Sequence, residues 1–233
     1  MIAIVDADLL IYRIGHASNG VGGKFAIRMM ADFVEDMCYN FVKADYVEGY
    51  LTGSDNYRHA IAKTAPYKGN RKGDKPVHYD LLREYLRDAW NFPIVEGQEA
   101  DDAVGIKAYE LREAGEDYMI CSLDKDLDMI EGWHYNFVKD LRYEIDDAQA
   151  RHNFYKQILT GDRIDNIIGL KGIGPVKAEK LLDGCKTEEE YYKAVLDAYD
   201  GDAERVLENG QLLWIRRKEN QMWTPPSLST SNG

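Results

Sequence analysis

The 233-residue sequence carries 41 acidic and 29 basic residues, which gives a formal net charge of −12. A hydrophobic fraction of 45% is enough for a folded core and excludes a disordered chain. The sequence has no apolar run of 18 residues, the length of a membrane-spanning helix. As an average, the net charge argues against nucleic acid as a partner, but the charge is unevenly distributed.

The cysteines and the first residues bear on the compartment. Cys38, Cys121 and Cys185 are odd in number and far apart, so they indicate reduced thiols rather than a disulfide framework. The first residues lack the basic segment of a signal peptide. Both features lead us to expect a cytoplasmic protein.

The first predicted element is a buried strand over residues 2–5, which ends at Asp6. Ligands bind at the carboxyl ends of strands in open α/β sheets, so Asp6 is a candidate site residue. Helical periodicity over 25–41 predicts a core helix. A second short strand is predicted over 47–51, and Asp55 follows it.

The next segment is basic. Between residues 58 and 75 there are six bases and one acid: Arg58, Lys63, Lys68, Arg71, Lys72 and Lys75 against Asp74. Proline and glycine in the same segment predict a mobile loop, and a basic mobile loop suits contact with phosphate. A solvated charge run is the usual alternative.

A predicted helix over 79–90 and a short strand over 93–95 lead to a cluster of acids. Glu99, Asp101 and Asp102 are three carboxylates within four residues, at the start of a helical pattern. The helix dipole favours acids in a first turn, which explains one or two of them. Three crowded carboxylates repel one another unless a cation lies between them, and hard oxygen ligands suit Mg²⁺ or Mn²⁺.

A fourth predicted strand, over 118–122, also ends in acids, Asp124 and Asp126. Residues 134–138 form a candidate fifth strand. Right-handed βα crossovers place the ends of parallel strands at one edge of a sheet. We therefore expect the acids that follow the four strands to converge, and this recurrence is the strongest physical signal in the sequence.

Beyond about residue 146 no further strand is expected, and helices are predicted over 148–159, 188–199 and 203–218. Gly172-Ile173-Gly174-Pro175 permits a tight hairpin followed by a helix. A helix N-terminus beside a glycine turn binds phosphate without reading base sequence. Lys171, Lys177 and Lys180 add positive charge there. An ordinary helix–turn–helix corner is the alternative.

Taken together, these motifs resemble the 5′-nuclease (flap endonuclease) superfamily, and in particular the 5′→3′ exonucleases of tailed bacteriophages. The motifs occur in family order over residues 1–185: Asp6, Asp55, Tyr67-Lys68-Gly69-Asn70-Arg71, Glu99-Ala100-Asp101-Asp102, Asp124 with Asp126, Asp162 with Asp165, and Gly172-Ile173-Gly174. Residues 209–213 also resemble the phage exonuclease C-terminus. The segment between Asp55 and Tyr79 is shorter than a long closed arch, and Asp8 and Asp128 are extra acids with no clear family role.

The resemblance implies an α/β fold with a mainly parallel central sheet flanked by helices, of the PIN/5′-nuclease type. The nuclease domain would span residues 1–145 and carry a short basic arch loop at 56–78. A helical DNA-binding region with a helix-hairpin-helix (helix–three-turn–helix) would span residues 146–233.

The resemblance also implies a metal-dependent 5′→3′ exonuclease or flap endonuclease that hydrolyses DNA phosphodiesters with two Mg²⁺ ions, which Mn²⁺ can replace. One ion would be held by Asp6, Asp55, Glu99 and Asp101, and the second by Asp124, Asp126 and Asp165, with Asp101 shared. Asp102 and Asp162 would act through water or through the ligands. Lys68 and Arg71 would contact the scissile phosphate. Further DNA contacts are expected at Arg58, Lys72, Gly172, Gly174, Lys177 and Lys180, and a K⁺ ion at the hairpin.

The implied partners are DNA with a 5′ end or a 5′ flap and an RNA primer in an RNA–DNA hybrid, with no membrane. The resemblance further implies a monomer in the cytoplasm of a phage-infected bacterium, acting in phage DNA replication or recombination.

Two alternatives from other functional classes stay open. Asp6-Ala7-Asp8 resembles the nucleophile motif of haloacid-dehalogenase-type phosphatases, although Leu10 stands where that family has Thr or Val. A phosphatase would also leave the glycine hairpin unexplained. A non-catalytic DNA-binding module would keep the hairpin and the basic loop but would not need the aligned carboxylates.

Overall fold

The computed structural model describes residues 1–71 and 73–228, so Lys72 lies outside the described residues. The chain divides into two compact units. The first unit comprises residues 1–56, 73–145 and 215–220, and the second comprises 57–72, 146–214 and 221–233. The basic segment therefore groups with the helical unit, and a short segment near the C-terminus returns to the sheet.

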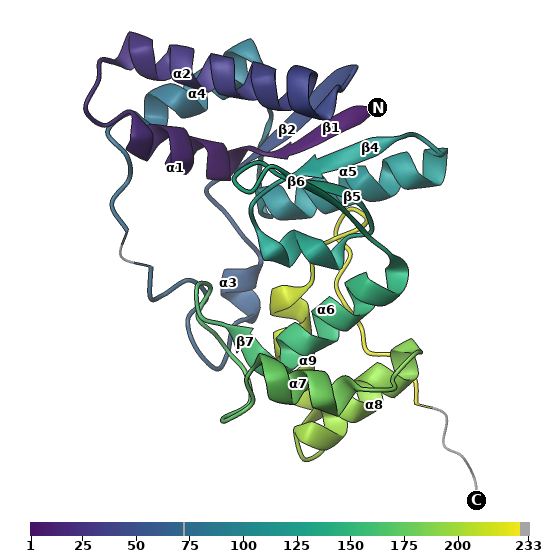
Figure 1. The fold of residues 1–233 in the computed structure, drawn as a ribbon. Helices are drawn as coiled ribbons and strands as arrows, with labels where there is room; N and C mark the ends of the chain where they lie inside the picture. The colour runs from purple at the N-terminus through teal and green to yellow at the C-terminus, as the bar shows by residue number, and fades with distance from the viewer. Residues whose placement is uncertain (72, 229–233) are drawn as a thin grey trace, which may run out of the picture. The chain divides into compact units, whose positions relative to one another are not determined.

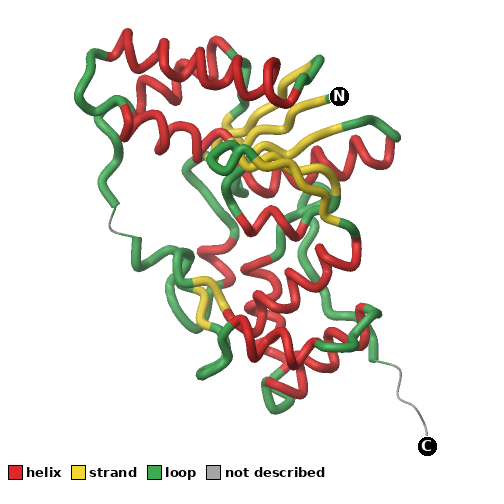
Figure 2. The backbone as a smooth tube through the Cα atoms, viewed as in Figure 1, coloured by secondary structure: helices red, strands yellow, loops and turns green. Residues whose placement is uncertain are grey.

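The first unit is built on a six-stranded sheet in the order β3-β2-β1-β4-β5-β6 (Figures 1 and 2). The strands are β1 Ile2–Asp6, β2 Tyr46–Thr52, β3 Ile94–Val95, β4 Tyr118–Cys121, β5 Gly132–Asn136 and β6 Leu141–Ile145. Strands β1 to β5 run parallel, and β6 is antiparallel to β5. Asp6 pairs with Tyr50, and its neighbour Val5 pairs with Cys121, so β1, β2 and β4 end at the same edge.

Helices cover both faces of this sheet. The helices are α1 Ala7–Ala17, α2 Gly23–Glu35, the π-helix η1 Asp36–Val42, α4 Tyr79–Ala89, α5 Ala100–Ala114 and the 3-10 helix η2 Lys125–Met129. Ala3 and Val5 of β1 belong to the cluster that includes residues of α1, α2 and α4, whereas Ile4 packs in the cluster that includes residues of α5. Alternate residues of the buried strand thus pack into two different hydrophobic clusters, because successive side chains of a strand point to opposite faces of the sheet.

The second unit is helical. Its elements are α3 Arg58–Ile61, α6 Asp147–Thr160, β7 Gly161–Asp162, β8 Ile167–Ile168, α7 Pro175–Leu182, α8 Glu188–Ala198 and α9 Ala203–Leu213. Its core is aromatic: the ring of Phe154 lies 5.1 Å from that of Trp214 and 5.4 Å from that of Trp223. The Trp223 ring occupies the space where a side chain on Gly210 would lie, so glycine is required in the middle of α9.

The predicted fold class is confirmed: a mainly parallel sheet flanked by helices precedes a helical region. Four details differ from the predictions. Neither α1 nor β6 was predicted, and the expectation of no strand after residue 146 is wrong because β7 and β8 form a two-residue ladder. The predicted helix over 203–218 ends at Leu213, because the chain leaves α9 to return to the first unit. No described helix is long and apolar enough to cross a membrane.

Candidate active site

The carboxyl ends of the parallel strands carry acids, as the sequence predicted. Asp6 is the last residue of β1 and is only 3% exposed. Asp8 lies in the first turn of α1, Glu99 immediately precedes α5, and Asp124 immediately precedes η2. The parallel topology thus brings acids from distant parts of the sequence to one edge of the sheet.

The electrostatics of Asp6 show that these acids lie close together. Burial, and then the charges of Asp8 and Asp124, raise the pKa of Asp6 to about 8. Burial also raises the pKa of Asp8, against hydrogen bonds from Thr52 and the charge of Arg83, and the charge of Glu99 adds to the rise. A buried acid surrounded by acids is stable when it is protonated or when a cation neutralises the group.

The donor set fits a hard divalent cation, because carboxylate oxygens are the ligands that Mg²⁺ and Mn²⁺ prefer. Within residues 1–71 and 73–228, no three His, Cys, Asp or Glu side chains are arranged as a group that could hold a metal ion. The fit therefore rests on the chemistry of the acids and on the raised pKa of Asp6, not on a formed coordination shell.

Ser122 connects two of these acids. Its hydroxyl donates to Oδ2 of Asp6 at 3.1 Å and accepts from the backbone N–H of Asp124 at 2.9 Å. Asp124 in turn accepts the N–H of Asp126 at 2.9 Å and so caps the N-terminus of the short helix η2. The loop after β4 is thereby fixed against the end of β1. Ser122 was not among the predicted site residues, although its place directly after a buried strand is a signal in the sequence.

Asp8, which had no clear family role, ties three elements together. The N–H of Thr52, at the end of β2, donates to Oδ1 and Oδ2 of Asp8 at 3.3 and 3.1 Å. Nη1 of Arg83 on α4 lies 3.6 Å from Oδ1 of Asp8, and the Arg83 guanidinium also donates to the carbonyl of Thr52. Asp8 thus fixes the ends of β1 and β2 relative to α4.

Asp102, which was predicted to act on the metal site indirectly, is held by backbone N–H groups. It is fully buried; Oδ2 accepts the N–H of Glu99 and Oδ1 accepts the N–H of Arg216, both at 3.1 Å. The guanidinium of Arg216 donates to Gln98 at 3.0 Å. Gly105 permits this approach, because a Cβ there would lie 2.5 Å from the carbonyl oxygen of Arg216. Asp102 therefore joins the start of α5 to the returning segment 215–220.

The remaining predicted ligands of the first unit lie in its loops and in one helix turn. Asp55 is exposed after β2, and its Oδ1 accepts the N–H of Asn56 at 2.8 Å. Asp101 is partly buried in the first turn of α5. Asp126 is partly buried, and Lys125 lies 3.8 Å from its Oδ1. Asp128, the second extra acid, accepts the hydroxyl of Tyr143 on β6 at 2.8 Å.

In the second unit, Asp162 and Asp165 are engaged by protein groups. Asp162 is 4% exposed, and its Oδ1 accepts the N–H of Ile164 at 2.6 Å and of Asp165 at 3.1 Å. Asp165 forms ion pairs with Lys68 and Arg71 at 3.6 and 2.7 Å. The two basic residues predicted to meet the scissile phosphate are therefore held together by one acid.

Arg58, which the sequence suggested as a DNA contact, is 3% exposed. Its Nε donates to the carbonyl of Leu212 at 2.9 Å, and Nη2 donates to that of Trp214 at 2.7 Å. These carbonyls terminate α9, so Arg58 neutralises a helix C-terminus in the interior. We therefore assign it to the fixing of α3 against α9 and not to a phosphate.

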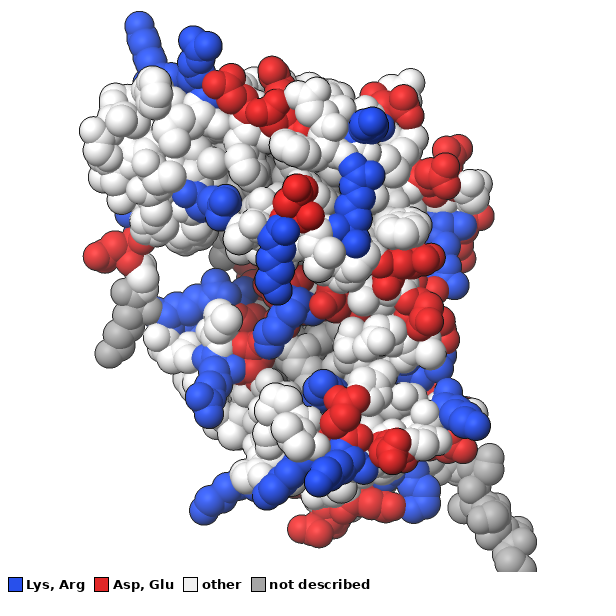
Figure 3. Space-filling model, viewed as in Figure 1, with Lys and Arg blue, Asp and Glu red and all other residues white. Residues whose placement is uncertain are grey.

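The predicted turn and the helix after it are present at residues 172–182. Gly172 has φ +79°, which favours glycine, and Gly174 precedes α7, in which Pro175 is the first residue. Nζ of Lys177 donates to the carbonyl of Gly172 at 2.9 Å, and Lys180 is exposed on the same helix. The face shown in Figure 3 carries Lys and Arg interspersed with Asp and Glu.

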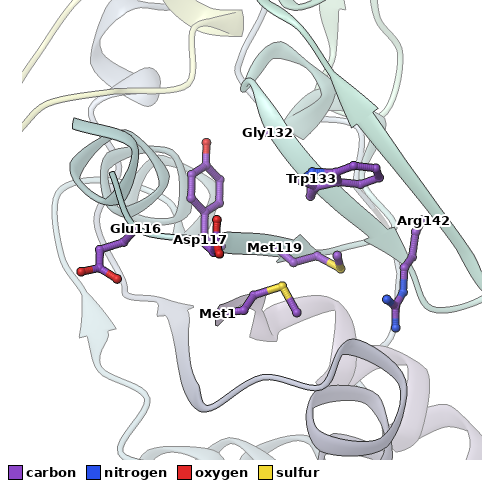
Figure 4. A pocket seen from close by; sticks show the side chains of 8 residues that line it. Met1, Glu116, Asp117, Met119, Gly132, Trp133 and Arg142 are labelled. Atoms are coloured by element: carbon purple, nitrogen blue, oxygen red, sulfur yellow. The ribbon is translucent and has the colours of Figure 1, made fainter. Parts of the chain in front are cut away.

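A pocket of about 510 Å³ lies elsewhere in the first unit, near the amino ends of β1, β4 and β5 (Figure 4). Met1, Met119 and Trp133 form much of its lining, together with Arg142 and the acids Glu116 and Asp117. Because parallel strands place their carboxyl ends at the opposite edge, this pocket is separate from the acids that follow the strands.

Comparison with known proteins identifies similar sequences. No protein-family model matches the sequence. The chain is 31% identical to a DNA polymerase I of Caldicellulosiruptor bescii over 166 residues, which cover 62% of this chain and 19% of the polymerase. It is 27% identical to a 5′-3′ exonuclease of Buchnera aphidicola over 202 residues, which cover 78% of this chain and 69% of the exonuclease. The chain thus spans less than a fifth of the length of that polymerase.

Among solved structures, a zinc-bound T5 5′-exonuclease superposes with a TM-score of 0.65 at 20% identity, covering 91% of this chain and 88% of the other. This likeness establishes the fold. Fold and sequence together confirm the resemblance to the 5′-nuclease superfamily. Within that superfamily, the matches include enzymes named 5′-3′ exonuclease and flap endonuclease Xni, as well as the DNA polymerases I.

The role of Asp102 can be tested by stability. Asp102→Ala leaves two buried N–H groups without their acceptor, and each costs about 1–3 kcal/mol, so the free energy of unfolding should fall by about 2–6 kcal/mol. Glu110→Ala, on the exposed side of the same helix, is the control and should change little. Urea unfolding in the absence of metal measures the free energy of unfolding of both variants. Unchanged stability in Asp102→Ala would contradict the structural role.

The role of Asp6 can be tested by pH. Its folded-state pKa of about 8 lies above the ordinary 3.8, so the folded state binds the extra proton and metal-free stability should fall as pH rises from about 4 to 8. Asp6→Asn removes this loss of stability. In EDTA, the stability of the variant relative to the wild type should therefore increase progressively as the pH rises to 8. Millimolar Mg²⁺ should raise the melting temperature of the wild type more than that of the variant. Parallel pH profiles, or equal responses to Mg²⁺, would contradict this account.

Proposed function

We propose that this chain is a metal-dependent 5′-nuclease that hydrolyses DNA phosphodiesters, acting as a 5′→3′ exonuclease and on 5′ flaps. The observation that carries the proposal is Asp6, a buried acid whose pKa is raised to about 8 first by burial and then by Asp8 and Asp124. This group lies at strand ends in the fold of T5 5′-exonuclease, which was crystallised with divalent metal ions. Groups with strongly shifted pKa values are concentrated at functional sites, so this crowding of acids supports a catalytic metal site.

In this proposal the strand-end acids hold two Mg²⁺ ions, with Mn²⁺ as a substitute. Asp6, Asp55, Glu99 and Asp101 hold one ion, and Asp124 and Asp126 hold the other with Asp101 shared. When bound, such ions stabilise the attacking and leaving oxygens of a phosphodiester. The protein's own part is orientation: Ser122 donates to one oxygen of Asp6, and Asp8 fixes the neighbouring strand ends through Thr52 and Arg83.

The positive groups of the second unit divide into two sets in the proposal. Lys68 and Arg71 contact the scissile phosphate, where negative charge develops in the transition state. Lys177, Lys180 and the N–H groups at the start of α7 grip a remote phosphate. The K⁺ ion expected at the hairpin would compete with Lys177 for the carbonyl of Gly172, so the proposed function includes no K⁺ ion.

The biological setting follows by similarity only. T5 5′-exonuclease shares the fold, and the relatives include polymerases and exonucleases. We propose a role in phage DNA replication or recombination in the host cytoplasm, as a monomer, with RNA–DNA hybrids as further substrates. The phosphatase and the non-catalytic module are not retained, because the enzymes with similar sequences described above have nuclease or polymerase names.

The metal assignment is tested at Asp101. Asp101→Asn should abolish cleavage while DNA binding survives, because the shared ligand serves both ions. The matched control is Asp128→Asn, the same substitution at an acid that holds Tyr143, which should retain cleavage. Single-turnover cleavage in Mg²⁺ and DNA binding in Ca²⁺ are measured for both variants. Near-normal turnover of Asp101→Asn would show that the two-metal assignment is wrong.

The two sets of basic residues are separated by kinetics. A contact made only in the transition state lowers the rate at saturation when it is lost, whereas a uniform contact weakens binding. Lys68→Ala should therefore lower the single-turnover rate, and Lys177→Ala should raise Kd and reduce the salt slope by about one counterion. Equal, salt-sensitive losses of affinity in both variants would show that the lysines only add positive potential.

A further inference from the structure

The basic loop at residues 66–71 contains a backbone conformation that needs support. Lys68 has φ +54°, a left-handed conformation that costs free energy for a residue with a side chain. Such conformations persist only where surrounding contacts determine them, and they concentrate at functional sites. The N–H of Lys68 donates to the carbonyl of Asp165 at 2.8 Å, so the contact that fixes this residue comes from the turn between β7 and β8.

The carboxylate of Asp165 makes further contacts to the same loop. The hydroxyl of Tyr67 donates to Oδ2 at 2.7 Å, and the guanidinium of Arg71 donates to Oδ1 at 2.7 Å. The ammonium of Lys68 lies 3.6 Å from Oδ2. The side chain of Asp165 is only 15% exposed, and Tyr67 is 4% exposed. Hydrogen bonds to an ionised group with little access to water are stronger than neutral ones.

Two amides join the same turn and loop on either side of Asp165. Nδ2 of Asn70 donates to the carbonyl of Arg163 at 2.6 Å, and Nδ2 of Asn166 donates to the carbonyl of Pro66 at 2.9 Å. The turn therefore holds the loop at both of its ends as well as in the middle. The loop that the sequence suggested to be mobile is fixed at these points.

We propose that Asp165 is a positioning residue, which holds Lys68 and Arg71 in the geometry in which they meet the substrate, and not a direct metal ligand. A carboxylate offers about four lone-pair sites, and three protein donors already face those of Asp165. A divalent ion at Asp165 would compete with the guanidinium of Arg71 at 2.7 Å and would meet the charge of the Lys68 ammonium at 3.6 Å. Lysine has three donors and arginine five, which is more than one carboxylate can accept.

This inference rests on the proposed function only for the statement that Lys68 and Arg71 meet the substrate. The contacts of Asp165 that carry the inference are between protein groups. The test therefore begins with amide hydrogen exchange in EDTA, without DNA, on the peptide that covers residues 66–71. Asp165→Asn removes the charge, Tyr67→Phe removes one hydroxyl and leaves the carboxylate unchanged, and Lys177→Ala is the control outside the loop.

Asp165→Asn should speed exchange at these amides by about tenfold, the change expected for loss of a charge-assisted hydrogen bond. Tyr67→Phe should give a smaller increase, and Lys177→Ala should match the wild type. Because Tyr67→Phe is a conservative change, it gives a result even if Asp165→Asn folds poorly. Unchanged protection in both loop variants would overturn the proposal, and cleavage of DNA by the wild type would leave the proposed function intact.

A second measurement separates positioning from general support of the fold. Tyr67→Phe should lower the ratio of single-turnover rate to Kd, and this loss should disappear in an Arg71→Ala background, because Tyr67 acts on Arg71 through Asp165. Additive losses would show that Tyr67 supports the fold independently of the basic residue. A fall in Mg²⁺ affinity in Asp165→Asn, with Tyr67→Phe unchanged in exchange, would show a metal ligand and overturn the proposal.

Discussion

Crowding of carboxylates at one edge of the parallel sheet is the constraint on which the first unit depends. Burial, followed by the charges of Asp8 and Asp124, raises the pKa of Asp6 to about 8. An arrangement of this kind costs stability unless a proton or a cation is bound. The elements around it have to hold the acids in place against their repulsion, and Ser122, Thr52 and Arg83 are the groups that do so.

The acids of this chain therefore perform different tasks despite their similar positions in motifs. Asp102 is fully buried and joins α5 to residues 215–220 through the N–H of Arg216. Asp162 accepts two N–H groups of the β7–β8 turn, and Asp165 binds the basic loop. Asp6 also accepts a hydrogen bond, from Ser122, but it faces the like charges of Asp8 and Asp124. These neighbouring charges make Asp6 a candidate metal ligand.

The sequence predicted much of the fold because its signals are local. Short apolar strands that end in acids and helices with clear apolar stripes lie close to their predicted positions, for example β1, β4, α4 and α6. The helix α1 was missed because it begins at Ala7, directly after β1 ends at Asp6, so no loop marks the change from strand to helix. The edge strand β6 is largely exposed and lacks the apolar signal of a buried strand.

Parts of the candidate site could not be predicted, because they depend on contacts between residues far apart in the sequence. In the sequence, Arg58 belongs to a run of bases that is typical of a surface. In the structure it is buried against carbonyls that lie about 150 residues further along the sequence. Likewise, nothing local in Glu99-Ala100-Asp101-Asp102 separates Asp101, which is partly buried, from Asp102, which accepts the N–H of Arg216. Spacing identifies which acids belong to a motif, and packing decides which protein groups each of them contacts.

The central claim, that the strand-end acids serve metal-dependent cleavage from a 5′ end, is tested most directly by product analysis. A 5′-labelled DNA duplex and a duplex with a matched 5′ flap are incubated with the protein, with Mg²⁺ or with EDTA. The account predicts short labelled products from the 5′ end of the duplex and release of the flap in Mg²⁺, and intact substrates in EDTA. Cleavage that persists in EDTA, or intact substrates under both conditions, would contradict it.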